Sequence, residues 1–552
     1  MEKIWIKTYP PGIPAEISID HVASLVTLFE DACTKYADQV AYISMDREMT
    51  YGELDRLSRD FAGWLQSLGM VKGDRVALMM PNLLQYPVAL FGTLRAGCVV
   101  VNVNPLYTPR ELEHQLKDSG AKAIVIVENF AHTLEQVIAK TGVKHVVVTP
   151  MGDLLGMIKG TLVNFVVRHV KKMVPAWSLP GSININAALA AGRRHGAEPV
   201  KLSHDDLAFL QYTGGTTGVS KGAMLTHGNI ASNVMQAHAW IKPVVVEGKE
   251  VVVTPLPLYH IFALTVSLTF LMVGGRNLLI ANPRDIAGFV KEWGKYPISV
   301  ATGVNTLFNG LLNHPDFAAL DFTTMKVSLG GGTAVQAPVA ERWQKVTKSP
   351  LLQAYGLTET SPAATINPLD LKEFNGSIGL PISSTELSIR DDAGKELAVG
   401  EIGEICIRGP QVMMGYWQRP EETANVMYAD GFLRTGDMGY VDSLGFFFIV
   451  DRKKDMILVS GFNVYPNEIE EVVAMHEGVG DVAAIGVPDD NTGEAVKIFV
   501  VRKDPNLTPE EIIAHCRKHL TGYKVPKQVE FRPDLPRTNV GKILRRALKE
   551  GA

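Results

Sequence analysis

Residues 212–222 read Tyr212-Thr213-Gly214-Gly215-Thr216-Thr217-Gly218-Val219-Ser220-Lys221-Gly222. An apolar run at 207–210 precedes them and is typical of a strand that leads into this stretch. Glycine lets the backbone turn tightly and bring N–H groups close to an anion, while hydroxyls and lysine suit phosphate oxygens or Mg²⁺. The pattern favours a loop that binds a polyphosphate, and the alternative is a flexible connector. The Walker loop has Ser or Thr after its lysine, whereas Gly222 follows Lys221 here, which argues against an ordinary P-loop NTPase.

Strand-like and helical patterns alternate on the N-terminal side of this stretch. We expect strands at 75–80, 99–103, 123–127 and 146–148, and helices at 51–68, 83–96 and 109–119. Apolar strands that alternate with helices indicate a parallel sheet covered on both faces. The sequence therefore predicts an α/β fold.

The alternation continues on the C-terminal side, up to about residue 366. Apolar runs at 251–253, 326–329 and 351–354 each end in a polar turn. In open α/β sheets such loops meet at one ligand crevice. One of the turns, Gly330-Gly331-Gly332-Thr333, does not match the GxGxxG fingerprint, so a nicotinamide cofactor is not expected.

The pattern changes twice more along the chain. Residues 371–450 have short strands and tight turns, which indicate a small β-barrel. A charged junction at 451–455 precedes a mixed unit of a size that fits a separate lobe on a hinge. We expect a large N-terminal domain at 1–450, with two parallel-sheet α/β subdomains up to about 370 and then the barrel. A hinge at 451–455 and a small mobile α+β domain at 456–552 follow.

Composition limits the classes of protein. Hydrophobic residues make up 46% and charged residues 20%, which is typical of a soluble globular chain. The net charge of -4 argues against nucleic acid as a partner. The four cysteines are scattered, which fits a cytoplasmic protein without disulfides or a zinc site. Residues 1–17 contain three prolines and no apolar core, so a signal peptide is not expected.

Residues 158–174 form an amphipathic pattern of their own. Ile158, Leu162, Val166, Val170 and Met173 recur at helical spacing, and the basic side chains Arg168, Lys171 and Lys172 lie on the other side. Such a helix can lie on an anionic membrane surface. An ordinary surface helix packed on its own domain is an equal alternative, and peripheral contact with the inner face of the membrane stays open.

Two carboxylates follow predicted strands, Glu359 in a crevice loop and Asp437 in the predicted barrel. Glu359 lies in Tyr355-Gly356-Leu357-Thr358-Glu359-Thr360, and a carboxylate beside a triphosphate needs a cation between them. Glu359 is thus a candidate Mg²⁺ ligand with Thr213 as helper, or an N-cap partner of Thr358. Asp437 can accept two hydrogen bonds from ribose hydroxyls, although an Asx turn is the simpler interpretation of the residues alone. Tyr355 offers a flat face to adenine or packs in the core.

Lys542 lies in Pro536-Arg537-Thr538-Asn539-Val540-Gly541-Lys542-Ile543-Leu544-Arg545. A lysine near a C-terminus is most often a solvated surface charge, but Pro536 and Gly541 indicate a defined loop. The other loop of this lobe is Ser460-Gly461-Phe462-Asn463-Val464-Tyr465-Pro466, where glycine would let the backbone pass close to an elongated ligand.

Taken together, these stretches resemble the adenylate-forming (AMP-binding) superfamily, and over essentially the whole chain they resemble its bacterial long-chain fatty-acyl-CoA synthetases. The resemblance implies a magnesium site of Thr213 and Glu359, and catalytic roles for Lys542, Glu359, Lys221 and His260. It implies adenylation chemistry at Lys542, a hinge at Asp451, and a CoA channel at Lys454, Ser460, Gly461 and Phe462. The implied nucleotide site comprises Tyr212, Thr213, Gly214, Gly215, Thr216, Thr217, Gly218, Lys221, Gly331, Gly332, Thr333, Tyr355, Gly356, Leu357, Thr358, Asp437, Arg452 and Lys542.

The resemblance also implies an acyl tunnel at His260, Phe262 and Gly303. From the residues alone, His260 is either a buried histidine bonded to backbone or part of the acyl entrance. Some members have a tryptophan gate just after this histidine, but Ile261 and Phe262 follow it here. Phe262 and Trp240 are therefore candidates for the gate.

The leading hypothesis is an ATP- and Mg²⁺-dependent ligase that converts a long-chain fatty acid to its CoA thioester through an acyl-adenylate, releasing AMP and pyrophosphate. One alternative keeps the adenylate and changes the acid to an aryl or medium-chain one. Another is a fatty-acid-binding or membrane-docking protein without catalysis, which the presence of Lys221, Glu359, Asp437 and Lys542 disfavours. A homodimer stays open.

Overall fold

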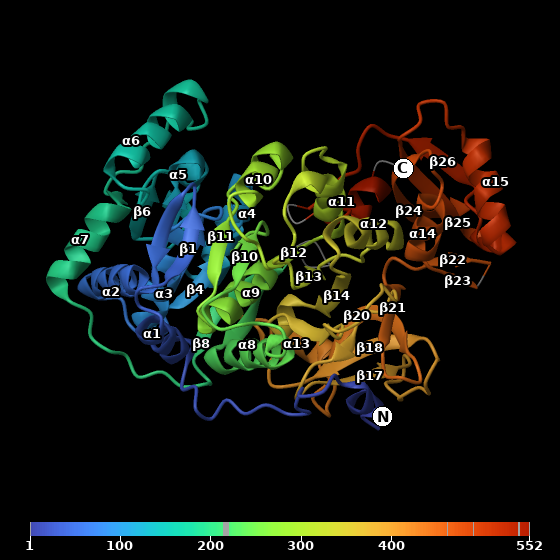
Figure 1. Ribbon diagram of the computed structural model, residues 1–552, viewed down its shortest axis with the longest axis horizontal. Coiled ribbons are helices and arrows are strands. Elements are labelled where there is room, and N and C mark those ends of the chain that lie inside the picture. Colours follow the sequence, from blue (N-terminus) through green and yellow to red (C-terminus); the bar gives the residue numbers. More distant parts are fainter. Residues whose placement is uncertain (1, 214–219, 461, 490, 539–540, 551–552) are drawn as a thin grey trace.

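The computed structural model describes residues 2–213, 220–460, 462–489, 491–538 and 541–550. A large lobe holds two extended sheets and a smaller antiparallel sheet, and the last part of the chain forms a separate small lobe beside it (Figure 1). The predicted loop residues Gly214, Gly215, Thr216, Thr217, Gly218 and Gly461 lie outside the described residues.

The first sheet has the strand order β19-β9-β8-β4-β3-β5-β6-β7. Pairing is parallel from β8 to β7, whereas β9 and β19 are antiparallel additions at one edge. The bounds are β19 Gly415–Tyr416, β9 Lys221–Thr226, β8 Leu207–Thr213, β4 Val99–Asn102, β3 Arg75–Met79, β5 Ala123–Val127, β6 His145–Thr149 and β7 Ile183–Asn184. Every residue of β4 and β5 is buried, as expected for parallel strands covered on both faces.

The second sheet has the order β16-β15-β14-β13-β12-β10-β11-β1-β2. Its middle strands, β14 to β1, are parallel, and antiparallel strands lie at both edges. The bounds are β16 Leu380–Pro381, β15 Ala363–Ile366, β14 Leu351–Gly356, β13 Val327–Gly330, β12 Val300–Gly303, β10 Val251–Thr254, β11 Arg276–Leu279, β1 Val40–Ser44 and β2 Arg47–Thr50. The polar turns predicted as crevice loops follow the carboxyl ends of β10, β13 and β14.

Helices form three layers around these two sheets. The middle layer shares one apolar core with both sheets and comprises α1 (Leu25–Lys35), α2 (Tyr51–Ser67), α3 (Gln85–Arg95), α8 (His227–Ile241) and α9 (Ile261–Met272). The outer face of the first sheet is covered by α4 (Pro109–Ser119) and α5 (Ala131–Glu135). The outer face of the second is covered by α10 (Ile286–Trp293), α11 (Asn305–Asn313) and α12 (Ala337–Thr347). The parallel α/β prediction is confirmed.

Local sequence explains why the predicted helix at 109–119 forms. The Thr108 side chain accepts from the backbone N–H of Glu111, and the Glu111 carboxylate accepts from that of Thr108 at 2.8 Å, a capping box. Pro109 occupies the first turn, where its missing N–H costs nothing. Gly120 ends the helix in the left-handed region with a φ of 60°, which glycine adopts without a steric penalty.

The amphipathic segment differs from the single helix that its pattern predicts. An α-helix, α6 (Met157–Phe165), continues into a π-helical turn, η4 (Val166–Val170), and the segment lies at the edge of the large lobe, where α7 (Ile185–His195) also lies (Figure 1). Its apolar side chains face outward: Met157 is 88% exposed, Ile158 87% and Leu162 61%. Within the described ranges, no helix has both the length and the apolar character needed to cross a bilayer.

An antiparallel sheet follows the second α/β unit, in the region where a β-barrel is predicted. Its order is β17 (Glu386–Arg390), β18 (Gly403–Arg408), β20 (Leu433–Val441) and β21 (Phe447–Arg452). Strand β21 runs through Asp451 and Arg452, which pair with Met438 and Asp437 of β20. The predicted hinge residue therefore lies inside a strand rather than in a loop, because the ladder with β20 extends that far.

The small lobe is a sheet with helices on both faces. The strand order is β23-β22-β25-β24, and β26 pairs in parallel with β25. Helices α14 and α15 share a core with one face, and α16 packs on the other. The bounds are β22 Ile457–Val459, β23 Phe462–Val464, α14 Pro466–Ala474, β24 Val479–Asp489, β25 Gly493–Arg502, α15 Pro509–His519, β26 Gln528–Phe531 and α16 Arg545–Lys549.

Candidate active site between the two lobes

Lys542 is presented to the large lobe by a tight turn of the small lobe. The backbone N–H of Thr538 donates to the carbonyl of Lys542 at 2.7 Å, and the Lys542 N–H donates back to Oγ1 of Thr538 at 3.1 Å. A Cβ on Gly332 would lie 4.0 Å from Cε of Lys542, and one on Gly541 would lie 2.9 Å from Oγ1 of Thr306. The lysine thus lies against the glycine turn that follows β13, where the sequence predicts a nucleotide.

The charge of Lys542 is set by its surroundings. Burial and the positive charge of Arg452 lower the pKa of Lys542 to about 8, against the opposing pull of Asp437 and Glu359. An ammonium with this pKa is protonated at neutral pH but gives up its proton a few pH units earlier than an exposed lysine. The same four side chains were singled out separately in the sequence, and the fold brings them into one electrostatic environment.

Asp437 is the centre of a buried polar group. Its Oδ1 lies 3.0 Å from Nε of Arg452, and its Oδ2 accepts a 2.7 Å hydrogen bond from the hydroxyl of Tyr355. The carboxylate raises the pKa of Arg452. Tyr355 is 9% exposed, so its ring packs in the core while its hydroxyl orients Asp437. This orienting role of Tyr355 is not visible in the sequence, because 82 residues separate it from Asp437.

Glu359 lies in a short 3₁₀ turn, η6 (Thr358–Thr360), that contacts strands β8 and β9. The hydroxyl of Tyr416 donates to its Oε1 at 2.7 Å, and burial raises the pKa of that tyrosine. The backbone N–H of Met413 donates to the Glu359 carbonyl at 2.8 Å. Tyr416 is therefore a site residue that sequence reasoning missed, since nothing local links it to a carboxylate 57 positions away.

The glycine-rich stretch connects two antiparallel strands. Thr213 ends β8 and pairs with Lys221, the first residue of β9. The Lys221 ammonium forms an ion pair with Glu422, and it lies 5.3 Å from the ring centroid of Tyr416. Tyr212 is turned away from this group, because its hydroxyl donates to Asp118 at 2.7 Å.

Two glycine turns follow the strands β13 and β14. A Cβ on Gly331 would lie 3.0 Å from the ring of Phe262, so that glycine permits the aromatic side chain to approach the backbone. Gly332 has a φ of 77°, in the left-handed region. The hydroxyl of Thr333, in the same turn, accepts from the Asn305 N–H at 3.4 Å.

The second glycine turn follows β14. A Cβ on Gly356 would lie 1.9 Å from the carbonyl oxygen of Pro362. The N–H of Leu357 donates to Oγ1 of Thr360 at 2.9 Å.

His260 begins helix α9 as its N-cap, and its Nδ1 accepts from the N–H of Phe262 at 3.4 Å. Burial and the nearby charge of Lys542 lower the pKa of His260 to about 4, so the ring is neutral at physiological pH.

Gly303 ends β12, and a Cβ there would lie 3.0 Å from the ring of Phe308. Trp240 is 1% exposed and donates to the Asn367 carbonyl at 3.1 Å, which makes it a core residue.

Two of the residues predicted to line a CoA channel, Ser460 and Phe462, are exposed on the small lobe. Ser460 is exposed with a φ of 52°, and its N–H donates to the Thr492 carbonyl at 2.8 Å. The ring of Phe462 is 55% exposed and stacks on Tyr523 with 4.8 Å between centroids. Burial lowers the pKa of Lys454. In this arrangement Lys542 is the residue of the small lobe that lies against the Gly332 turn.

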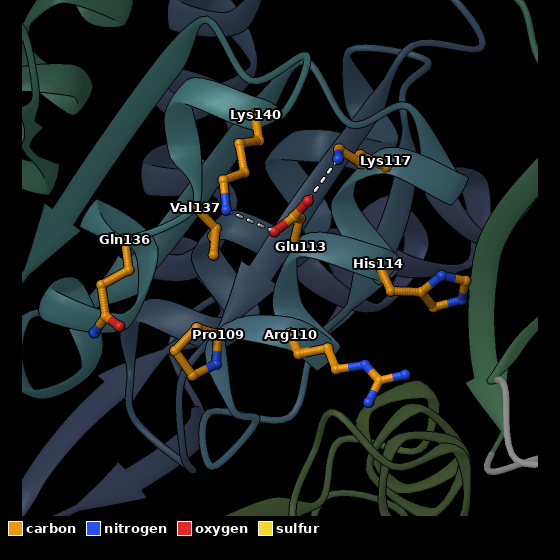
Figure 2. A pocket seen from close by; sticks show the side chains of 8 residues that line it. All are labelled: Pro109, Arg110, Glu113, His114, Lys117, Gln136, Val137 and Lys140. Carbon is orange, nitrogen blue, oxygen red and sulfur yellow. Dashed lines mark hydrogen bonds and ion pairs between the residues drawn. The ribbon is translucent and has the colours of Figure 1, made fainter.

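A cleft of about 540 Å³ lies beside the β9 end of the glycine-rich stretch. Figure 2 shows Glu113 between Lys117 and Lys140, with which it forms ion pairs of 2.5 and 3.5 Å. Nε2 of His114 lies 3.1 Å from the Ser220 carbonyl oxygen, and Arg110 adds a further positive charge to the lining. Basic side chains therefore outnumber acidic ones in this cleft.

The comparisons with known proteins agree with this geometry. Residues 29–417 match the AMP-binding enzyme family and residues 468–542 the AMP-binding enzyme C-terminal domain, so the chain belongs to the AMP-binding enzyme family.

Individual relatives cover all or nearly all of the chain. The sequence is 61% identical to the long-chain-fatty-acid–CoA ligase of Yersinia pestis, over 100% of this chain and 98% of that protein. The fold resembles ATP-bound MatB from Rhodopseudomonas palustris, with 29% identity, a TM-score of 0.79, and coverage of 95% of this chain and 98% of that one. It also resembles a benzoate CoA ligase from Burkholderia xenovorans LB400, with 26% identity, a TM-score of 0.80, and coverage of 95% and 99%.

Proposed function

We propose that this protein is a long-chain-fatty-acid–CoA ligase that uses ATP and coenzyme A and forms a fatty-acyl adenylate on the way. The observation that carries the adenylation step is the contact of Lys542 with the Gly332 turn, beside Asp437 and Arg452. The observation that favours a long-chain fatty acid is the 61% identity to a long-chain ligase over the full chain.

In the first half-reaction, a carboxylate oxygen of the fatty acid attacks the α-phosphorus of ATP. An acyl–O–P bond forms, the bond from that phosphorus to the bridging oxygen breaks, and pyrophosphate leaves with the electron pair. The ammonium of Lys542 would lie between the carboxylate and the α-phosphate and stabilise the negative charge that develops there. Asp437, held by Tyr355 and Arg452, would accept hydrogen bonds from the ribose.

Oxygen donors in the crevice fit a magnesium ion bound together with phosphate. Among the described residues, no three His, Cys, Asp or Glu side chains are grouped so as to hold a metal by themselves. Mg²⁺ is commonly held by one or two carboxylates plus substrate phosphates, and Glu359 with the Thr213 hydroxyl provides such a set. The ion would supply charge compensation for the triphosphate. Tyr416 would orient the Glu359 carboxylate through its hydrogen bond to Oε1.

In the second half-reaction, the thiol sulfur of CoA attacks the acyl carbon. A C–S bond forms, the acyl–O–P linkage breaks at the acyl carbon, and AMP leaves. Ser460 and Phe462 are exposed on the small lobe, and a rotation of that lobe about Asp451 would bring them to the adenylate. Phe262, packed on Gly331, would form the wall between the acyl tunnel and the nucleotide.

The exposed face of α6 and η4 favours contact with an anionic lipid surface. Met157, Ile158, Leu162, Phe165 and Val170 are all more than half exposed. The sequence contains no Asp or Glu between Asp153 and Glu198. Lys159 and Arg168 pair with Asp46 and Glu128 from other segments, and Lys171 and Lys172 add further positive charge. Apolar side chains flanked by lysine suit the boundary between headgroups and acyl chains, from which a fatty acid could be taken.

Acid-dependent exchange of radiolabelled pyrophosphate into ATP tests the proposal. With a panel of acids, exchange is expected with long-chain fatty acids, and AMP should appear in equal amount to acyl-CoA once CoA is added. Exchange confined to aryl or medium-chain acids would support the alternative CoA ligase. No exchange with any acid, together with binding of oleate, would support a non-catalytic fatty-acid-binding protein.

A further inference from the structure

Arg545 lies three residues after Lys542, at the start of α16, and its side chain is 15% exposed. Its Nη2 donates to both carboxylate oxygens of Glu470 at 2.8 Å and to Oδ1 of Asn467 at 2.7 Å. Its Nη1 lies 3.5 Å from Oδ2 of Asp455 and 3.7 Å from Oδ1 of Asp451. One guanidinium therefore joins the end of the Lys542 turn to helix α14 and to the junction between the lobes.

The carboxylates around Arg545 need a cation. Asp451 is fully buried, and its oxygens accept from the N–H groups of Arg452 at 2.6 Å and Asn467 at 2.7 Å. Burial raises the pKa of both Asp451 and Glu470. Removing one partner from a buried ionic group leaves its neighbours uncompensated, which is costly. The planar fork of arginine meets several carboxylates at fixed angles, which a lysine cannot reproduce.

These contacts form a continuous link from the nucleotide side of the crevice to Lys542. Asp437 pairs with Arg452, and Arg452 is adjacent in the chain to Asp451. Asp451 faces Arg545, and Arg545 ends the segment that begins with Lys542. Fixing one end of a short turn fixes the position of the side chain that it carries. A small displacement of a catalytic group strongly lowers the reaction rate.

We propose that Arg545 is a positioning residue for adenylation: by clamping the junction carboxylates and helix α14, it holds Lys542 at the Gly332 turn. This inference rests on the proposed function and assigns Arg545 to the first half-reaction only. Rotation of the small lobe for thioester formation would remove Lys542 from the crevice, so the second half-reaction does not need the clamp for this purpose.

The test compares Arg545→Gln and Arg545→Lys with Arg546→Gln as the matched control. Arg546 is the next residue of the same helix, is 70% exposed, and pairs with Glu550 one turn away at 2.8 Å. Pyrophosphate exchange should fall about 10- to 100-fold in Arg545→Gln, with the KM for ATP unchanged. Thioester formation from supplied acyl-adenylate should persist, Arg545→Lys should recover part of the exchange rate, and Arg546→Gln should match the wild type.

Equal loss of both half-reactions in a folded Arg545→Gln protein would overturn the inference, and so would an unchanged exchange rate. If Arg545→Gln does not fold, the double variant Arg545→Gln with Glu470→Gln removes the charge imbalance and is judged by the same two rates. Failure of the wild type to catalyse any exchange would instead refute the proposed function, so the two failures are distinguishable.

Discussion

The hydroxyl of Tyr355, at the end of β14 in the second parallel sheet, donates a 2.7 Å hydrogen bond to Asp437 in β20 of the antiparallel sheet. The bond joins two structural units of the large lobe at the point where the small lobe docks. Because Arg452 holds the other carboxylate oxygen at 3.0 Å, the orientation of Asp437 is fixed from both sides.

Tyr355→Phe should weaken ATP binding while leaving chemistry largely intact. The variant removes a hydrogen bond to a charged group, worth roughly 1.5 kcal/mol, so the KM for ATP should rise about tenfold with little change in kcat. Tyr440→Phe is a suitable control, since Tyr440 lies on β20, the strand of Asp437, and its ring stacks on Phe448. An unchanged KM in Tyr355→Phe would show that Asp437 does not depend on this bond.

Lys542→Ala should abolish acid-dependent pyrophosphate exchange and preserve CoA acylation from supplied fatty-acyl adenylate. The reason is that only the first step places negative charge between a carboxylate and a phosphate next to this ammonium. Lys549→Ala, an exposed lysine in the following helix, is the control. Comparable loss of both steps would contradict the assignment of Lys542 to adenylation.

The pH dependence of adenylation follows from the pKa of Lys542, which burial lowers to about 8. The required form is the ammonium, which predominates below this pKa and is lost above it, so kcat/KM for ATP should fall as pH rises beyond about 8. Lys542→Arg should be slower but lose this descending limb, because arginine stays protonated. A descending limb that persists in Lys542→Arg would assign it to another group.

Glu359→Ala should lower the adenylation rate by roughly 10²-fold or more, because charge compensation at the triphosphate is lost. Tyr416→Phe should give a smaller effect and raise the Mg²⁺ concentration needed for half-maximal rate, since the carboxylate remains but loses its orienting bond. Near-normal activity of Glu359→Ala at all Mg²⁺ concentrations would remove this residue from the metal site.

Vesicle binding tests the exposed face of α6 and η4. Ile158→Glu with Leu162→Glu should reduce co-sedimentation with anionic vesicles, and replacing Lys171 and Lys172 by Gln should do so most at low salt. Turnover of fatty acid in detergent should be unchanged in both. Binding equal to that of the wild type would leave the segment as a plain surface element.

Arg168 forms a tertiary ion pair that the sequence pattern does not predict. The pattern groups it with Lys171 and Lys172, but its Nε and Nη2 are bonded to Glu128, which is 1% exposed. Lys221 also forms an ion pair that the sequence does not predict, because its partner Glu422 belongs to a distant segment. Tertiary ion pairs of this kind leave no local signal, because their partners are far apart in the chain.

The local sequence was sufficient to predict elements whose ends are fixed by their own residues. The helix at 109–119 has the predicted bounds, since Thr108, Glu111 and Gly120 satisfy its ends without outside help. The buried strand at 123–127 is likewise as predicted. The π-helical turn after Phe165 and the extension of β21 through Asp451 were not predicted, because both depend on contacts with other elements. Roles inferred from the resemblance, such as those of Ser460 and Phe462, stay predictions.

The most direct measurement is a crystal structure of the protein with a hydrolysis-resistant fatty-acyl adenylate analogue. The account predicts that the phosphate lies beside Lys542 at the Gly332 turn, that the ribose hydroxyls bond to Asp437, and that the alkyl chain passes His260 and Phe262. An analogue bound elsewhere, with Lys542 still docked against an empty turn, would contradict it.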